Sequence, residues 1–351
     1  MGPLGRGKNQ ANATLQEQDG SARAIEFTVR LAEQTPELAE AAAFYRAVLP
    51  LLRQYRRTVA PLRMEQQSVR SKLEAGLPLL VGETLPFDPK TARTLFLNLC
   101  KAVESARVSE KSSPGDGAMR TGRSLDAFSL WKRAQDGDGR SLRAAAARQI
   151  RRAVEHRDLD LASVWEMLAG GDWRRLELTA VGLKLDAELL RALARYSLKP
   201  SFQLWAQELQ EEADKEHPAD KEHPAIFDHW KRGYCPVCGS APSLSELQGK
   251  EGARRLRCDL CGAGWRYPHL KCASCQNDNY KLMSYFSVEG EEDTYKLQAC
   301  DVCQEYIKII KTFEPIPVDW LPVQDLATLH LDLIAAEHGY TRMTPQLRSG
   351  P

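Results

Sequence analysis

Four pairs of cysteines lie in the second half of the chain, and two residues separate the members of each pair. The pairs are Cys235 and Cys238, Cys258 and Cys261, Cys272 and Cys275, and Cys300 and Cys303. Such spacing lets a tight turn direct both sulfurs at one ion, and two turns supply the four thiolates of a tetrahedral site. The eight cysteines therefore predict two four-cysteine metal sites.

The distances along the chain favour pairing in sequence order. Nineteen residues separate Cys238 from Cys258, and 24 separate Cys275 from Cys300. Both gaps are long enough for a hairpin that brings one turn under the next, as in zinc ribbons and rubredoxins. Only ten residues separate Cys261 from Cys272. We therefore expect the first four cysteines to form one site and the last four another, with an interleaved arrangement as the alternative.

The residue that follows each pair distinguishes the two sites. Gly239 and Gly262 follow the first two pairs, whereas Gln276 and Gln304 follow the last two. Because glycine readily adopts the left-handed conformation that such turns often need, we expect the second site to be looser or more exposed. Tetrahedral thiolate sites accept zinc or iron, so the metal would be structural or redox-active respectively. The spacing does not fit a ferredoxin cluster, which has three closely spaced cysteines.

The elements that must position these cysteines change character near residue 213. Residues 25–212 show a helical period, which predicts an all-helical domain of six to eight helices. We expect one helix to follow Thr35 and to be kinked or divided at Pro50. Others are expected over residues 91–103, 144–155 and 159–168, after a capping Asp186, and again from Pro200. The apolar face of the helix that follows Thr35 is expected to contain Leu38, Ala42, Tyr45, Val48, Leu49 and Leu52.

The second half has short segments with the pattern of strands. We expect strands over residues 254–258, 265–267, 280–288, 294–299 and 306–313, and a last helix capped by Asp325. The fold class is therefore α+β and multidomain, with an all-α helical domain followed by two rubredoxin-like or zinc-ribbon modules and a C-terminal helix. The predicted division is a flexible tail over residues 1–24, the helical domain over 25–212, a linker over 213–228, the first module over 229–268 and the second module over 269–345.

The predicted linker contains a tandem Asp-Lys-Glu-His-Pro-Ala repeat over residues 214–225. Its two histidines, His217 and His223, could suggest a metal site. Because the repeat is polar and interrupted by proline, we interpret it as an exposed connection.

Composition excludes several classes of protein. Among 351 residues, 48 Lys and Arg balance 47 Asp and Glu, and residues 229–345 contain 13 against 15. A nucleic-acid-binding module normally carries a basic face, so we expect no nucleic-acid partner. No apolar run approaches the ~18 residues of a membrane span, and no signal peptide is evident, so we expect a cytoplasmic protein with reduced thiols. The chain has no nucleotide-binding glycine loop, nucleophile elbow or HExxH helix, and no enzyme activity is expected.

The order of the motifs resembles the FdhE formate dehydrogenase accessory proteins. The resemblance is specific from about Trp230 to Arg342 and weaker in the helical half, where it depends on residues 76–80 and on Leu95 and Phe96. The matching segments are residues 234–240, 256–261 with Trp265, 272–275, 299–306, and 325–332 with Gly339 and Tyr340.

The resemblance implies a cytoplasmic accessory protein that binds iron or a similar metal and assists maturation of a respiratory formate dehydrogenase before export. The expected partner is the immature catalytic subunit, and its twin-arginine signal peptide is one candidate for the bound segment. We expect the groove between the helical and metal-binding halves to receive this client. An acidic loop over residues 289–293 is a candidate contact. The oligomeric state is open, with a homodimer among the options, and the alternative function is a zinc-ribbon protein that binds nucleic acid or acts in transcription.

Overall fold

The computed structural model describes residues 22–105, 139–216 and 226–343. Most of the predicted N-terminal tail and both histidines of the tandem repeat lie outside these residues. A helix already runs over residues 22–34, and Ala24 in it is buried, so the last residues of the predicted tail belong to a helix.

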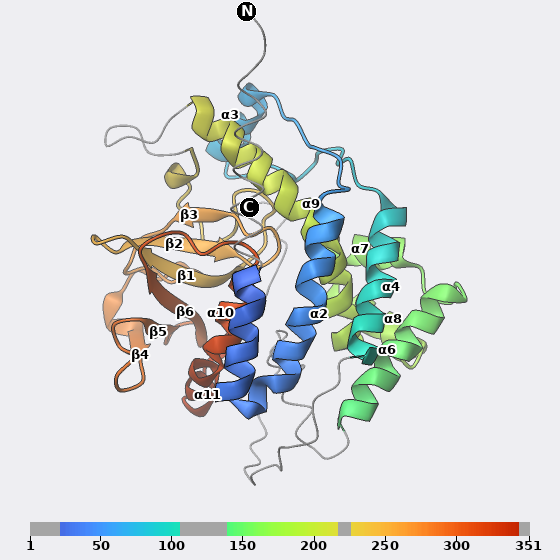
Figure 1. The fold of residues 1–351 in the computed structure, drawn as a ribbon. Coiled ribbons are helices and arrows are strands. Elements are labelled where there is room, and N and C mark those ends of the chain that lie inside the picture. The colour runs from blue at the N-terminus through green and yellow to red at the C-terminus, as the bar shows by residue number, and fades with distance from the viewer. Residues whose placement is uncertain (1–21, 106–138, 217–225, 344–351) are drawn as a thin grey trace, which may run out of the picture.

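The first half is helical, as predicted, and its helices pack along one side of a sheet formed by the second half (Figure 1). After the segment 22–34 come η1 (Pro36–Leu38), α2 (Ala39–Arg56), α3 (Gln66–Glu74), α4 (Pro89–Ser105), α6 (Gly139–Glu155), α7 (Leu161–Gly170), α8 (Trp173–Gly182) and α9 (Ala187–Glu216).

Helix α2 buries the predicted apolar residues, from Ala42 to Leu52, at helical spacing. It continues through Pro50, so the helix is not divided at this residue, and the other expectation, a kink, stays a prediction. Helix α9 likewise runs unbroken through Pro200, where we predicted a new helix. A proline in a helix interior costs about 3 kcal/mol. Buried Leu198 and Trp205 lie on either side of Pro200, and their packing against the core offsets that cost.

The second half forms one continuous sheet with the strand order β3-β2-β1-β6-β5-β4, and β7 pairs with β6. Its elements are η2 (Ile226–His229), β1 (Pro242–Gln248), β2 (Ala253–Cys258), β3 (Gly264–Arg266), η3 (Tyr280–Leu282), β4 (Met283–Phe286), β5 (Tyr295–Cys300), β6 (Glu305–Thr312), α10 (Leu321–Ala327), α11 (Leu329–Glu337) and β7 (Thr341–Arg342).

Strand β1 was not predicted, and it joins the two metal-binding modules. It pairs antiparallel with β2 of the first module and parallel with β6 of the second, with Leu244 opposite Lys308. The expected strand over residues 280–288 is shorter than predicted, because residues 280–282 form η3. The proposed boundary at residue 268 therefore divides a shared sheet, although the division into modules itself stays a prediction.

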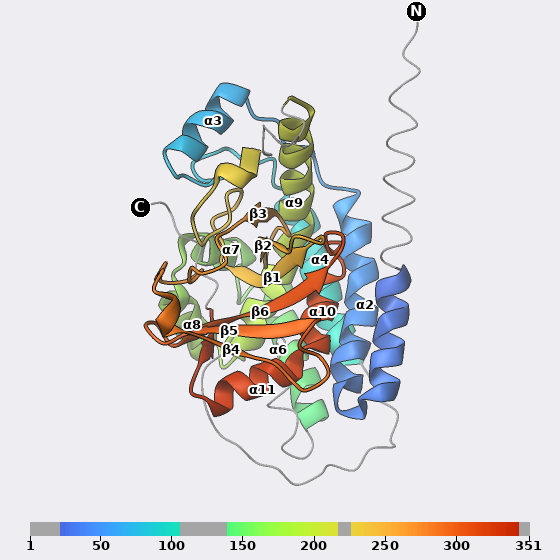
Figure 2. The same ribbon diagram turned by 90° about the vertical axis from the view of Figure 1, so that its left-hand side faces the viewer.

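The expected last helix is two helices, α10 and α11, that break at Thr328. Figure 2 shows α11 beside β4 and β5, and α10 packs against α2. Asp325 does not cap a helix, because it lies inside α10 and its carboxylate pairs with Lys308 of β6 at 2.5 Å. Burial favours the neutral form of Asp325, but Arg342 and Lys308 outweigh it and lower the pKa of this carboxyl.

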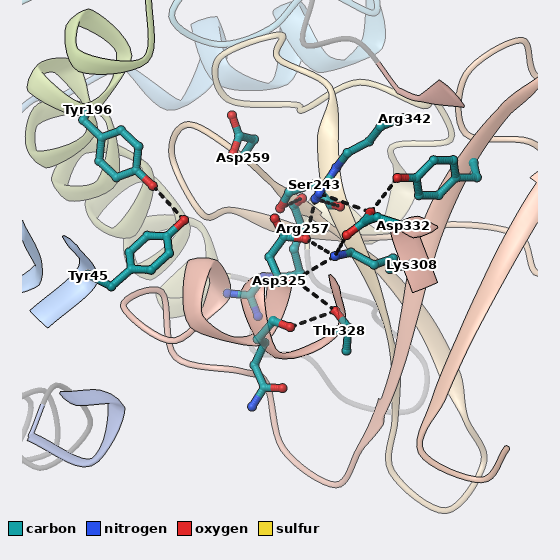
Figure 3. A network of polar contacts seen from close by, with 12 residues as sticks. Tyr45, Tyr196, Ser243, Arg257, Asp259, Lys308, Asp325, Thr328, Asp332 and Arg342 are labelled. Atoms are coloured by element: carbon teal, nitrogen blue, oxygen red, sulfur yellow. Dashed lines mark hydrogen bonds and ion pairs between the residues drawn. The ribbon is translucent and has the colours of Figure 1, made fainter. Parts of the chain in front are cut away.

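A buried charge network fixes the two C-terminal helices to the sheet (Figure 3). Lys308 also pairs with Asp332 of α11 at 2.8 Å, and Arg342 of β7 pairs with Asp325 at 2.5 Å. Tyr306 donates a hydrogen bond to Asp332 at 2.5 Å. Two cations thus face two carboxylates away from solvent, an arrangement that is costly to break by removing one member.

Candidate metal centres

The first cluster consists of Cys235, Cys238, Cys258 and Cys261, all of them buried. Its sulfurs lie 3.4 Å apart between Cys238 and Cys258, 3.5 Å apart between Cys235 and Cys261, and 3.6 Å apart between Cys238 and Cys261. Four sulfurs at a metal–sulfur distance of about 2.3 Å in a tetrahedron would be about 3.8 Å apart. The cluster can therefore hold a metal ion with little rearrangement.

The second cluster consists of Cys272, Cys275, Cys300 and Cys303. The sulfurs of Cys272 and Cys303 lie 3.7 Å apart, and those of Cys275 and Cys300 lie 3.6 Å apart. Cys275 is exposed and Cys303 half-buried, which confirms that this site is the more exposed one. The structure thus assembles the predicted cysteines in sequence order and not in the interleaved alternative. Their role as metal ligands stays a proposal.

All four cysteine turns share one backbone geometry. In each turn, the N–H that follows the second cysteine donates to the carbonyl of the first, at 2.8 to 3.2 Å. That following residue has a positive φ in every case: 76° at Gly239, 73° at Gly262, 64° at Gln276 and 56° at Gln304. A residue with a Cβ destabilises this conformation by about 1–2 kcal/mol. The second cluster therefore stores backbone strain that glycine removes from the first.

Turn N–H groups also point at the sulfurs, from Val237 to Cys235 at 3.4 Å and from Cys261 to Cys258 at 3.5 Å. These donors favour thiolates, but burial raises the pKa of the Cys235 and Cys261 thiols well above their usual range. Burial also raises the pKa of Cys303 in the second cluster to about 11. Four thiolates in one cluster therefore need a cation to offset their charge, as a bound metal would provide.

The helical half closes over the first cluster at the turn of Cys235 and Cys238. Leu79 and Leu80 donate their backbone N–H groups to the carbonyls of Pro236 and Val237, both at 2.9 Å. The hydroxyl of Tyr234 donates to the carbonyl of Gly76 at 2.9 Å. The segment 76–80, one basis of the family resemblance, thus packs directly against a metal-binding turn.

Helix α9 contacts the other turn of the first cluster through Asp259, which lies between Cys258 and Cys261. Arg195 donates to the Asp259 carboxylate at 2.6 Å, and Lys199 donates to its backbone carbonyl at 2.9 Å. Burial would raise the pKa of Asp259, but the cations of Lys199 and Arg195 lower it to about 2. With both of its turns covered, the first cluster belongs to the joint core of the two halves.

Exposed apolar residues flank the cysteines of the second cluster along the chain. Of the ten large hydrophobic side chains that are exposed among the described residues, five come from segments that flank these four cysteines. We call them the second-cluster surface: Leu270, Tyr280, Leu282, Tyr285 and Val302. An exposed apolar group of this kind is typical of an interaction site.

The other singled-out residues have structural positions. Cys100 is buried in α4, and burial raises the pKa of its thiol to about 12, so it is a core residue. Arg254 and Arg257, members of a basic cluster in the sequence, are buried within the sheet. Sequence reasoning missed the roles of Asp259 and of the segment 76–80 at the first cluster, because both depend on contacts between distant segments.

Two family models match the second half of the chain. They describe the FdhE central domain, over residues 234–269, and the FdhE C-terminal domain, over residues 270–348. None of the helices in the described ranges combines the length and hydropathy of a membrane span.

Curated relatives match over the same region. A protein FdhE homolog of Aquifex aeolicus is 40% identical over 125 residues, which is 33% of this chain and 42% of that protein. Protein FdhE of Escherichia coli O127:H6 is 36% identical over 114 residues, which is 32% of this chain and 36% of that protein. The matched segment thus spans less than half the length of these relatives.

A solved structure matches over nearly the whole chain. The crystal structure of the FdhE protein from Pseudomonas aeruginosa aligns with a TM-score of 0.55 and 21% identity, covering 94% of this chain and 95% of that one. This comparison supports the shared fold, including the helical half. The resemblance inferred from the motifs is confirmed: residues 234–348 match the models of the FdhE central and C-terminal domains, and the chain shares the fold of an FdhE protein.

Proposed function

We propose that this chain is a cytoplasmic, non-enzymatic accessory protein that binds the immature catalytic subunit of a respiratory formate dehydrogenase and assists its maturation before export. The observation that carries the proposal is the assembly of the four cysteine pairs into two clusters within FdhE central and C-terminal domains. The family resemblance is the basis for naming formate dehydrogenase as the client, and the two cysteine clusters are the features that such an accessory protein would use.

The two clusters would have different duties. The first, enclosed by α9 and the segment 76–80, would hold a structural ion that fixes the helical half to the sheet. The second would hold an ion near solvent, where a partner or a small reagent can reach Cys275. Zinc or iron fits either donor set, and iron in the second cluster would add redox chemistry when bound.

The second-cluster surface is our candidate for the client contact. Buried contacts join the helical and metal-binding halves at Asp259 and Tyr234, in the region where we had expected a client groove. The exposed apolar side chains of the second-cluster surface come instead from segments next to the cysteines of the second cluster. The acidic loop over residues 289–293 is a separate candidate. Strand β4 begins at Met283, which pairs with Cys300 of the second cluster, and the loop follows the other end of the strand, beyond Phe286. Its acidic charge would suit a cationic signal peptide.

The nucleic-acid alternative has little support from the structure. The basic cluster on β2 is largely used inside the molecule, because Arg257 pairs with Glu246 at 2.5 Å and Arg254 is buried. Neither Arg254 nor Arg257 is therefore available for the phosphate contacts that dominate nucleic-acid affinity.

An anaerobic affinity capture from the native host tests the proposal. Tagged wild-type protein should retain a formate dehydrogenase catalytic subunit, identified by mass spectrometry, and a deletion strain should lose respiratory formate dehydrogenase activity. A Tyr280→Asp variant should retain its metal and lose most of the captured subunit. Leu178→Asp, at an equally exposed apolar position on α8, is the matched control and should capture normally.

The outcomes separate the levels of the proposal. Unchanged formate dehydrogenase activity in the deletion strain would contradict the accessory role. Capture of ribosomal or transcription components in place of the dehydrogenase would favour the nucleic-acid alternative. Normal capture by Tyr280→Asp would leave the accessory role in place and move the client contact elsewhere, with charge reversal over residues 289–293 as the next variant.

A further inference from the structure

Arg254 lies on β2 in the first module, but its side chain serves the second. The residue is 2% exposed, and its guanidinium reaches the segment that leads from the first cluster to Cys272. The ring of Tyr267 lies 5.5 Å from the guanidinium carbon, close enough for a cation–π contact.

Every nitrogen of this guanidinium has a neutral acceptor. Three of its bonds go to backbone carbonyls of one loop, over residues 268–271. The bonds run from Nε to Ser245 Oγ at 3.1 Å, from Nη1 to the carbonyls of Pro268 at 2.8 Å, His269 at 2.9 Å and Lys271 at 3.1 Å, and from Nη2 to Gln298 Oε1 at 2.6 Å.

Gln298 and Tyr267, which both contact Arg254, bind further carbonyls of this loop, up to that of Cys272. Gln298 donates from Nε2 to the carbonyl of His269 at 3.1 Å. The Tyr267 hydroxyl donates to the carbonyl of Cys272 itself at 2.9 Å. Four carbonyls between residues 268 and 272 are therefore fixed from the sheet. The turn of Cys272 and Cys275 is thus anchored to strands of both modules.

The charge of Arg254 has no carboxylate partner among the described residues. The other buried cations of the sheet do have one: Arg257 pairs with Glu246, and Lys308 pairs with Asp325 and Asp332. A buried cation without a counter-charge is strongly disfavoured. Four thiolates around a divalent ion have a net charge of −2, and around a trivalent ion −1. Such a centre next to the Arg254 loop would supply the missing counter-charge.

We propose that Arg254 is a positioning residue for the second metal centre, which it orients through the carbonyls of the loop before Cys272 and whose negative charge it offsets. The inference depends on the proposed function only in that the second cluster must hold a metal ion. It also predicts that substitution of Arg254 leaves metal binding by the first cluster unchanged.

The test uses the full chain loaded with Zn²⁺, in wild-type form and as Arg254→Gln, Arg254→Lys and Arg255→Gln. The last is the matched control, because it removes an arginine from the next position of the same strand. Zinc release is followed with a chromogenic chelator, and each cluster is followed by mass spectrometry of alkylated cysteine peptides. Substitution of groups that orient metal ligands typically weakens binding by about 10- to 100-fold.

We expect Arg254→Gln to remain folded by circular dichroism and to release one zinc ion about 10- to 100-fold faster, with alkylation rising only at Cys272, Cys275, Cys300 and Cys303. Arg254→Lys, which keeps the charge, should lie between Gln and wild type, and Arg255→Gln should match wild type. Co²⁺-loaded protein should show a shifted thiolate-to-cobalt band for the second site alone.

Wild-type release rates for both ions in a folded Arg254→Gln variant would overturn the inference. Equal loss from both clusters would also overturn it, because Arg254 would then support the sheet in general. A wild-type chain that binds no ion at the second cluster would instead refute the metal site itself, a result distinct from failure of the Arg254 role.

Discussion

The two cysteine clusters have the same ligands and the same backbone turns, but they lie in opposite environments. The first is fully buried, with Asp259 paired to α9 and the segment 76–80 hydrogen-bonded to its other turn. The second has an exposed Cys275 and exposed apolar residues that flank its cysteines along the chain. The cysteine motif alone therefore determines only whether an ion can bind. Residues far from the motif decide whether that ion acts as a core component or as an accessible centre.

The largest expected difference is between Cys261→Ser and Cys275→Ser. Losing the first centre should prevent stable folding, because structural zinc contributes on the order of 10 kcal/mol and a typical protein is stable by only about 5–15 kcal/mol. Losing the second should leave a folded chain with one zinc ion. Yield, thermal unfolding and zinc content measure this. A Cys261→Ser protein that melts like wild type would remove the distinction between the clusters.

Metal removal should also separate the centres. On exposure to excess chelator, the second cluster should lose its ion at least about tenfold faster, since it needs no opening of the joint core. Cys275 and Cys303 should then be alkylated before Cys235 and Cys238. Simultaneous alkylation of both sets would indicate that the two centres open in one cooperative step.

Asp259→Asn should destabilise the joint between the halves by about 2–3 kcal/mol. Removing one member of a buried ion pair typically costs 3–5 kcal/mol, and the Asp259 side chain is 31% exposed, which reduces the effect. Denaturant unfolding of the zinc-loaded protein at pH 7 measures the change. Asp278→Asn, at an exposed position beside the second cluster, is the control and should shift stability by less than about 0.5 kcal/mol. Equal effects of the two variants would argue against the anchoring role of Asp259.

The smallest effect concerns the turns themselves. Gln276→Gly should stabilise the second module by about 0.5–1 kcal/mol. The glycine removes the strain of a left-handed φ of 64°, and the greater conformational entropy that it gives the unfolded chain offsets part of this gain. Gly239→Ala should destabilise the first by about 1 kcal/mol for the converse reason. Denaturant midpoints of the zinc-loaded variants test the pair, and changes of the same sign would show that turn strain is not what distinguishes the clusters.

The sequence was most informative where chemistry depends on local spacing. The cysteine pairs and the greater exposure of the second site followed from residues within a few positions of one another, and the order of pairing followed from the gaps of 10 to 24 residues between the pairs. The amphipathic face of α2 was equally readable.

What could not be read depended on long-range contacts. Strand β1, with the sequence Pro-Ser-Leu-Ser-Glu-Leu-Gln, has no β-branched or aromatic residue to mark it, and it forms because β2 and β6 lie on either side. Pro200 stays within a helix because core packing outweighs its local preference. The partners of Arg254 are up to 44 residues away in sequence, so no local pattern indicates its role.

The parallel pairing of β1 with β6 has a consequence for how the chain is made. Leu244 leaves the ribosome 64 residues before its partner Lys308, so β1 has one unpaired edge throughout the synthesis of the second module. Contacts of this separation form late, and open strand edges are sites of aggregation. Metal capture by the first four cysteines is local and can precede this closure. We therefore expect metal supply during translation to determine how much of the nascent chain reaches the native fold.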